Sequence, residues 1–284
     1  MLGTYLLDAL KSLLFGIVEG LTEWLPISST GHMILLEQLC KFKSVSEGFF
    51  EMFLVVIQLG AIFAVVVMFW NKLWPIKTVV DENGVKTKKL HKGIINLWLK
   101  VIVGSIPAGV LGLLLDDFLD EHLYNYITVA IMLILYGVLF IVVEMYNKNR
   151  KPKIRKLTQL TYKDALIMGC CQALSLIPGT SRSGATILGG ITYGASRRVA
   201  SEFAFFLAIP AMLGASLLKI VKFGFAFSAG ELAILLDGMI VAFAVSLLVI
   251  KFLMGYIKKH NFNLFGLYRI ILGIVVLVFF AASK

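Results

Sequence analysis

The chain has 284 residues, of which 59% are hydrophobic and 15% are charged, and its mean hydropathy is +0.88. This composition leaves too little polar surface for a water-soluble protein, so we predict an all-α protein of the membrane. The formal net charge of +10 does not indicate a nucleic-acid partner, because Lys and Arg fall between apolar segments and follow no single amphipathic stripe. We expect contacts with membrane lipid and none with nucleic acid.

The first apolar region covers residues 5–39 and is interrupted near its middle by a polar segment that contains Pro26 and Gly31. Non-helical backbone persists at membrane depth only where protein or a water-filled cavity satisfies its N–H and C=O groups. We therefore predict a re-entrant helical hairpin over 5–39. An ordinary helix that is kinked at Pro26 is the alternative.

Six later segments are long enough for spanning helices, since a span takes about 20 apolar residues. They cover residues 49–70, 94–115, 123–143, 199–218, 232–250 and 262–283. Between the third and fourth of these, the region 162–191 is interrupted around Pro178 in the same way as the first region. It predicts a second re-entrant hairpin, again with a kinked helix as the alternative.

The charged connections predict an orientation in the membrane. The connections 71–92 and 144–163 are rich in Lys and Arg, whereas the connection 116–122 holds the acids Asp116, Asp117, Asp120 and Glu121. Basic connections stay in the cytoplasm. This rule places the N-terminus outside, with the first hairpin entering from outside and the second from the cytoplasm.

The two interrupted regions resemble each other at a spacing of about 152 residues. The alignment pairs Gly16 with Gly169, Glu19 with Gln172, Pro26 with Pro178 and Ser29 with Ser181. Duplication combined with opposite orientation predicts an inverted-topology repeat, with residues 1–143 as the first repeat and 144–284 as the second. Each repeat has three spanning helices, and the two hairpins meet at mid-membrane.

The polar part of the first hairpin carries groups with catalytic potential. Glu19 and Glu23 lie one helical turn apart on one face, and ionisable groups at membrane depth mark a functional site by default. The alternative is that they bond only each other or a neighbouring helix. The segment 26–32, PISSTGH, adds three hydroxyls and His32, which we interpret as catalytic and not merely as a helix-bonding residue.

The polar part of the second hairpin, PGTSRSGAT at 178–186, is a loop of small residues that opens a helix. Free N–H groups and the helix dipole favour an anion at such a place. Arg182 supplies a planar fork suited to phosphate oxygens, and Ser181, Ser183 and Thr186 supply further donors. The segment therefore predicts a phosphate cradle.

These motifs, EGLTE at 19–23 with PISSTGH at 26–32 and PGTSRSGAT at 178–186, resemble the undecaprenyl-diphosphate phosphatase family of the bacitracin-resistance type. The resemblance covers nearly the whole chain, and no hallmark residue departs from it. It implies a multi-pass enzyme of the bacterial inner membrane that hydrolyses C55 polyprenyl diphosphate to the monophosphate and recycles the carrier for peptidoglycan synthesis. It also implies an extracytoplasmic site and a divalent cation.

Our hypothesis assigns a role to each candidate residue. Ser29 is the nucleophile and His32 its base or the acid for the leaving group, with direct attack by water and Glu23 as base as the alternative. Arg182 neutralises developing charge. Phosphate is held by Ser28, Thr30, Ser181, Arg182, Ser183 and Thr186, and Mg²⁺, or alternatively Ca²⁺, is held by Glu19 and Glu23.

A carrier or flippase for polyprenyl phosphate is the competing function, because inverted repeats with broken helices also build secondary transporters. The fold alone does not separate the two functions. The sequence also leaves a homodimer open.

Overall fold

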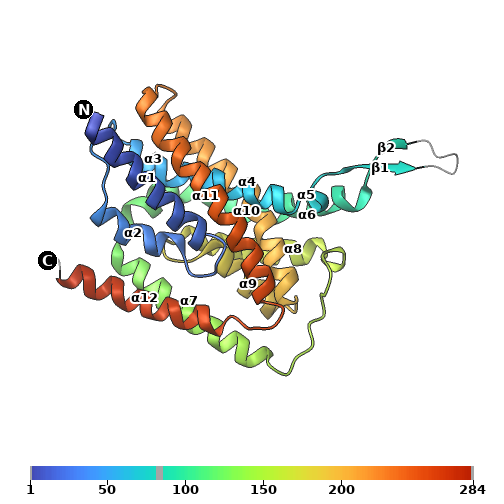
Figure 1. Ribbon diagram of the computed structural model, residues 1–284. Helices are drawn as coiled ribbons and strands as arrows, with labels where there is room; N and C mark the ends of the chain where they lie inside the picture. The colour runs from blue at the N-terminus through green and yellow to red at the C-terminus, as the bar shows by residue number, and fades with distance from the viewer. Residues whose placement is uncertain (1, 81–85, 283–284) are drawn as a thin grey trace.

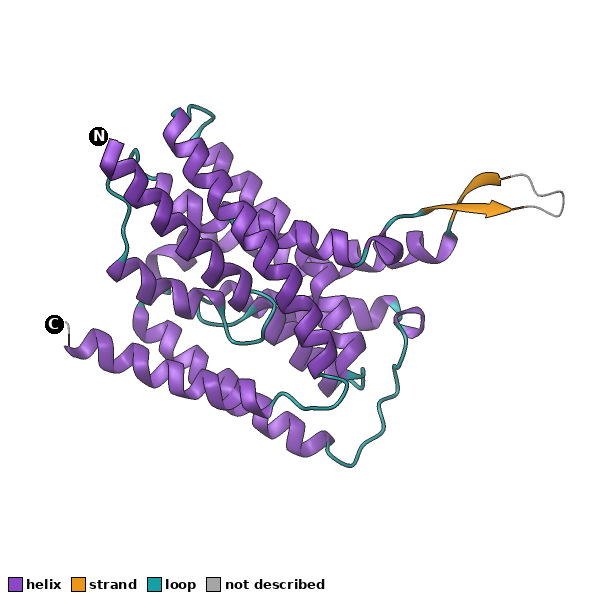
Figure 2. Cartoon of the chain, in the orientation of Figure 1, coloured by secondary structure: helices purple, strands orange, loops and turns teal. Residues whose placement is uncertain are grey.

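The computed structural model describes residues 2–80 and 86–282, which form a bundle of helices with one projecting β-hairpin (Figures 1 and 2). The first half holds α1 (Leu2–Thr22), α2 (Ser29–Leu39), α3 (Phe49–Val56), α4 (Gln58–Met68), α5 (Trp70–Leu73), β1 (Ile76–Val80), β2 (Lys86–Leu90), α6 (Lys92–His122) and α7 (Tyr126–Asn147). The second half holds η1 (Leu157–Gln159), α8 (Tyr162–Ala173), η2 (Leu174–Leu176), α9 (Arg182–Thr192), α10 (Arg197–Phe223), α11 (Ala229–Tyr256) and α12 (Asn263–Ala282).

Six helical segments in the described part of the chain are long and apolar enough to cross a membrane. They are Phe49–Met68, Lys92–Leu115, Tyr126–Asn147, Arg197–Phe223, Ala229–Tyr256 and Asn263–Ala282. Each overlaps one predicted span, so the prediction of six such helices is confirmed. The first consists of α3 and α4, which form one continuous rod because Ile57 between them keeps helical dihedral angles.

Polar and apolar side chains are distributed as lipid requires. Leu113 and Leu248 on the outer surface are 75% and 70% exposed, whereas Glu19 and Arg269 inside the bundle are 1% and 0% exposed. In water this arrangement would expose apolar side chains and bury charged ones, both of which are unfavourable. The protein is therefore a multi-pass membrane protein.

Each of the two interrupted regions consists of two helices that are separated by non-helical backbone. In the first region α1 ends at Thr22 and α2 begins at Ser29, and in the second region α8 and the short η2 precede α9, which begins at Arg182. The predicted polar residues lie in or beside these interruptions. The structure thus places Ser29 and Arg182 at the beginnings of helices, with Glu19 in the last turn of α1 and Glu23 directly after it.

Two elements differ from the sequence predictions. The connection 71–92 contains an antiparallel hairpin of β1 and β2, in which Ile76 pairs with Leu90. β-branched residues such as Thr78 and Thr87 favour such strands. The predicted connection 116–122 is helical and continues α6 to His122, because none of its own residues is Gly or Pro; the side chains of Asp116, Asp117 and Asp120 lie outside the described part.

Glycines allow the helices to pack closely in pairs. A Cβ atom on Gly169 of α8 would lie 1.9 Å from the carbonyl oxygen of Gly104 on α6, and one on Gly137 of α7 would lie 2.7 Å from that of Gly266 on α12. Small residues let helix backbones approach in membranes. These contacts hold α8 against α6 and α7 against α12, and the second pair runs side by side in Figure 1.

We expect Gly169→Ala to destabilise the protein, because its methyl group would collide with the backbone of α6 and force the two helices apart. Overpacking of this kind costs about 1 to 3 kcal/mol, which corresponds to a Tm lower by roughly 5 °C. Gly109→Ala on α6 is the control, since a Cβ there meets nothing within 4 Å. Thermal unfolding in detergent measures both variants, and equal Tm values would contradict the close packing.

Candidate active site

The two interruptions bring two helix N-termini to one place. Ser28 precedes α2 and its hydroxyl accepts a hydrogen bond from Gly31 N at 3.4 Å, while Ser181 precedes α9 and accepts from Gly184 N at 3.1 Å. Each helix start retains backbone N–H groups without partners inside the helix, and the helix dipole adds partial positive charge. The site is therefore suited to an anion.

A cavity of about 500 Å³ lies where these helix starts meet. Its polar wall combines residues of both interruptions with residues of neighbouring helices, namely Glu23, Ser28, Ser29, Thr30, Gln58, Ser105, Gln172, Ser175, Thr180, Ser181 and Arg182. The opposite wall is made of small and apolar residues of α6 and α10, including Gly109, Leu113 and Gly214. Since Leu113 is 75% exposed, the cavity reaches the lipid-facing surface. Its shape suits a molecule with a polar head and an apolar tail.

The ion pair between Arg182 and Glu23 joins the two halves of the chain inside this cavity. Arg182 Nη2 lies 2.8 Å from Glu23 Oε1 and also donates to Gln58 Oε1 at 3.0 Å. Ser29 Oγ donates to the other carboxylate oxygen, Glu23 Oε2, at 2.8 Å. Glu23 thus orients a hydroxyl with one oxygen and a guanidinium with the other.

Glu19 lies one turn before Glu23 and is 1% exposed. Its carboxyl group interacts with that of Glu23, while its Oε1 atom has no hydrogen-bond partner within the described residues. Hard divalent cations take oxygen ligands of this kind, so the pair fits a Mg²⁺ or Ca²⁺ ion. The described residues contain no group of three His, Cys, Asp or Glu side chains that could hold a metal. A cation here would need hydroxyl, water or phosphate oxygens as further ligands.

His32 lies beside the cavity and contacts other partners than Ser29. Its Nδ1 donates to the Ser28 carbonyl oxygen at 2.7 Å, and its Nε2 lies 2.7 Å from the Tyr268 hydroxyl. Ser28 has a φ of 73°, which is costly for a residue with a Cβ. His32 therefore stabilises the strained backbone ahead of Ser29, and Glu23 is the group in hydrogen-bonding position to take the Ser29 proton.

Ser183 and Thr186 do not line the cavity, although the sequence predicted both as phosphate ligands. Ser183 Oγ donates to the Glu23 carbonyl oxygen at 3.0 Å, and Thr186 Oγ1 donates to the Arg182 carbonyl oxygen at 2.8 Å. Neither side chain is part of the cavity wall. They hold the backbone of the ion-paired residues in place.

Arg269 on α12 is a site residue that the sequence analysis missed. It is fully buried and donates to the carbonyl oxygens of Pro26 at 3.3 Å and Gly179 at 2.9 Å. It therefore ties the first interruption to the second. Its signal in the sequence was a charged residue inside the apolar segment 262–283. Gln58 and Gln172 were also missed as parts of the cavity wall.

Comparisons with known proteins identify the family. A model of the family described as bacitracin resistance protein BacA matches residues 12–275. The chain belongs to this family. The BacA family match includes both interruptions. The undecaprenyl-diphosphatases of Acetivibrio thermocellus and Desulfitobacterium hafniense are 58% and 57% identical to this chain. Both alignments cover 98% of this chain, and they cover 100% and 98% of the two relatives. That of Enterococcus faecalis is 56% identical, over 96% of this chain and 97% of its own.

We expect Arg269→Lys to lower stability, because one ammonium group does not reach carbonyl oxygens in both interruptions. Each buried acceptor left unpaired costs about 1 to 3 kcal/mol, or a Tm lower by roughly 5 °C or more in total. Arg155→Lys, at an exposed position bonded to one backbone carbonyl, is the control. An unchanged Tm for Arg269→Lys would exclude the bridging role.

Proposed function

We propose that the protein is a membrane phosphatase that hydrolyses undecaprenyl diphosphate to undecaprenyl phosphate and inorganic phosphate. The observation that carries this proposal is the cavity in which Ser29 and Arg182, at two helix N-termini, both contact Glu23 beside an apolar wall. The relatives named undecaprenyl-diphosphatase support the same substrate. The reaction returns the lipid carrier to peptidoglycan synthesis and fits the link of the family to bacitracin resistance.

The diphosphate is bound by positive groups from the second interruption and hydroxyls from the first. The guanidinium of Arg182 carries five N–H donors, and its two hydrogen bonds with Glu23 and Gln58 both involve Nη2, so the other donors can bind phosphate oxygens. The N–H groups at the starts of α2 and α9 face the same cavity, with Thr30 and Thr180 in its wall. The apolar wall on α6 and α10 takes the polyprenyl chain.

In the proposed reaction Ser29 Oγ attacks the terminal phosphorus atom while Glu23 Oε2 takes the hydroxyl proton. The bond between this phosphorus and the bridging oxygen breaks, and undecaprenyl phosphate leaves with the electron pair. Water then hydrolyses the phosphoserine, which releases inorganic phosphate and restores Ser29. Arg182 stabilises the charge that develops on the transferred group. Direct attack by water, with Glu23 as base, is the competing route.

The proposed cation site consists of Glu19 and Glu23, where the unpartnered Glu19 Oε1 supplies a ligand. A bound cation neutralises charge on the phosphate oxygens. The residues around it hold the carboxylates in place, since Ser183 bonds the backbone of Glu23. Mg²⁺ is the proposed ion and Ca²⁺ the alternative.

The packing of the helices supports an inverted repeat with two re-entrant hairpins. Gly16 on α1 and Gly169 on α8 are aligned in the two repeats, and each packs against a spanning helix of the other half, α11 and α6 respectively. The beginning of α1 and the end of α12 lie on the side opposite to the β-hairpin (Figure 1). We propose that the lysine-rich hairpin is cytoplasmic and that the cavity opens to the extracytoplasmic side of the bacterial inner membrane.

Phosphate release from purified protein in detergent tests the function, because a carrier has no compartments to connect there. We expect the wild-type protein to release inorganic phosphate from C55 diphosphate, and Ser29→Ala to lose at least about a thousandfold in turnover. Ser105→Ala is the matched control, since this cavity hydroxyl donates to Val101 in its own helix and to no other described residue. Substantial turnover by Ser29→Ala would favour attack by water, and no release by the wild type would refute the function.

We expect Glu19→Gln to weaken Mg²⁺ binding by at least about tenfold, because the amide removes one anionic oxygen ligand. Isothermal titration of Mg²⁺ into the purified protein measures this without reference to turnover. Glu37→Gln, on the outer part of α2 and paired with Lys41, is the control. Equal affinities for the wild type and Glu19→Gln would remove Glu19 from the cation site.

The orientation predicts which positions react from outside the cell. In a variant without its native cysteines, a cysteine at the exposed position Glu121 should react with a membrane-impermeant maleimide on intact cells. A cysteine at the exposed position Asn149 should react only after the membrane is permeabilised. The opposite pattern would invert the orientation. Labelling of both cysteines on intact cells would contradict the single membrane crossing that we propose between them.

A further inference from the structure

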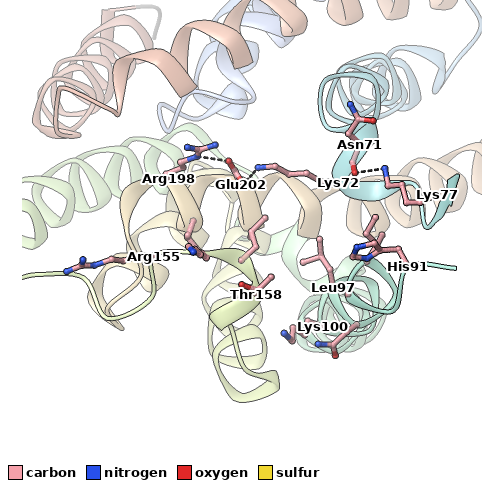
Figure 3. A pocket seen from close by; sticks show the side chains of 16 residues that line it. Asn71, Lys72, Lys77, His91, Leu97, Lys100, Arg155, Thr158, Arg198 and Glu202 are labelled. Atoms are coloured by element: carbon pink, nitrogen blue, oxygen red, sulfur yellow. Dashed lines mark hydrogen bonds and ion pairs between the residues drawn. The ribbon is translucent and has the colours of Figure 1, made fainter. Parts of the chain in front are cut away.

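A second cavity, of about 770 Å³, lies between α5, the first turns of α6, the connection before α8 and the start of α10 (Figure 3). We call it the basic pocket, because Lys72, Lys77, Lys100, Arg155, Lys156 and Arg198 line it against one acidic residue, Glu202. The count leaves an excess of five positive charges. Such a surface favours an anionic ligand.

The single acid of the basic pocket is already neutralised. Glu202 is 3% exposed and forms ion pairs with Lys72 at 2.5 Å and with Arg198 at 2.9 Å. Figure 3 shows Glu202 with Lys72 and Arg198 on one side of the pocket and Lys100 on the other. The remaining cations, among them Lys77, therefore face the pocket without a carboxylate from its lining.

Lys100 is the most informative of these cations. It is 5% exposed, and no hydrogen bond or ion pair of its ammonium group is found among the described residues. The carboxylate of Asp164 attracts the ammonium group electrostatically, but it accepts hydrogen bonds from Thr161 N and Oγ1 at the start of α8. The Tyr162 ring lies 6.0 Å away. A buried ammonium with so few acceptors is costly, and an anion in the pocket would supply them.

The basic pocket is separate from the candidate active site. α6 contributes Gly93 to Lys100 to the basic pocket and Ser105 to Leu113 to the other cavity, and the midpoints of these two stretches lie about 19 Å apart along the helix. No described residue lines both. A ligand in the basic pocket therefore need not compete with substrate for Arg182.

Aromatic residues indicate the depth of the basic pocket. Trp70 and Trp74 on either side of its α5 residues are 46% and 43% exposed and stack at 4.6 Å. Trp residues gather at the boundary between the hydrocarbon and the head groups. Basic pockets between helices at this level bind anionic head groups. We propose that the basic pocket binds a phosphate group at this membrane surface, from an anionic lipid head or from free phosphate.

Native mass spectrometry of the purified full-length chain tests the site. The protein is titrated in separate arms with dioctanoyl-phosphatidylglycerol, with inorganic phosphate and with dioctanoyl-phosphatidylcholine as the zwitterionic reference. Lys100→Met removes the buried charge and keeps an apolar side chain of similar length. Lys258→Met is the control, because it removes a charge from an exposed position outside the pocket.

We expect Lys100→Met to weaken binding of phosphatidylglycerol or of phosphate by at least about tenfold, with Lys258→Met unchanged. The arm that responds identifies the source of the phosphate group. Turnover of C55 diphosphate in detergent should be retained by both variants, so loss of this site is distinguishable from loss of the active site. If Lys100→Met does not fold, Lys77→Gln at the half-buried strand position is expected to weaken binding of the same ligand. If the wild type and the pocket variant bind phosphatidylglycerol with equal affinity and also bind phosphate with equal affinity, the proposal is overturned.

Discussion

The Arg182–Glu23 ion pair is the contact on which the arrangement of the candidate active site depends. Its partners lie 159 residues apart in the chain and come from the interruptions of the two halves. Glu23 is 5% exposed and Arg182 18%, so neither charge is well hydrated without the other. Removal of one partner from such a pair costs about 3 to 5 kcal/mol, because the other charge is left uncompensated. Both interruptions must therefore be in place for either to be stable.

Other buried polar contacts are arranged around this pair, and each of them satisfies a polar group that would otherwise be buried without a partner. Arg269 connects the backbone of Pro26 with that of Gly179, and Ser183 connects α9 with the backbone of Glu23. His32 satisfies the carbonyl group of Ser28, whose backbone is strained. These contacts hold the two helix N-termini toward one cavity before any ligand arrives. Such preorganisation is what electrostatic catalysis of phosphoryl transfer requires.

Local pattern in the sequence was sufficient for the spanning helices and for the position of the polar segments. A span is decided by about 20 consecutive apolar residues, and the hydroxyl-rich segments stand out against them. It also identified Ser29, Glu23 and Arg182, all of which line the cavity. The chemical roles of these three residues, of Glu19 and of His32 remain predictions, and so does the repeat itself.

The missed features depend on contacts between distant parts of the chain. Nothing near Arg269 or Gln58 in sequence indicates that they reach Gly179 and Arg182. The partners of His32 and the inward turn of Ser183 follow likewise from tertiary packing. The β-hairpin is a different case, because β-branched residues such as Ile76, Thr78 and Thr87 favour strands, whereas the connection 71–92 was interpreted only through its basic charge.

A double-mutant cycle on Glu23 and Arg182 tests the central claim most directly, with kcat/KM for C55 diphosphate measured per folded molecule. The single variants are Glu23→Gln and Arg182→Gln, and the double variant carries both. If the two side chains act as one unit, the double variant should be no more than about tenfold slower than the slower single variant. Losses that multiply across the two single variants would contradict the account, because they would show that the two residues act independently.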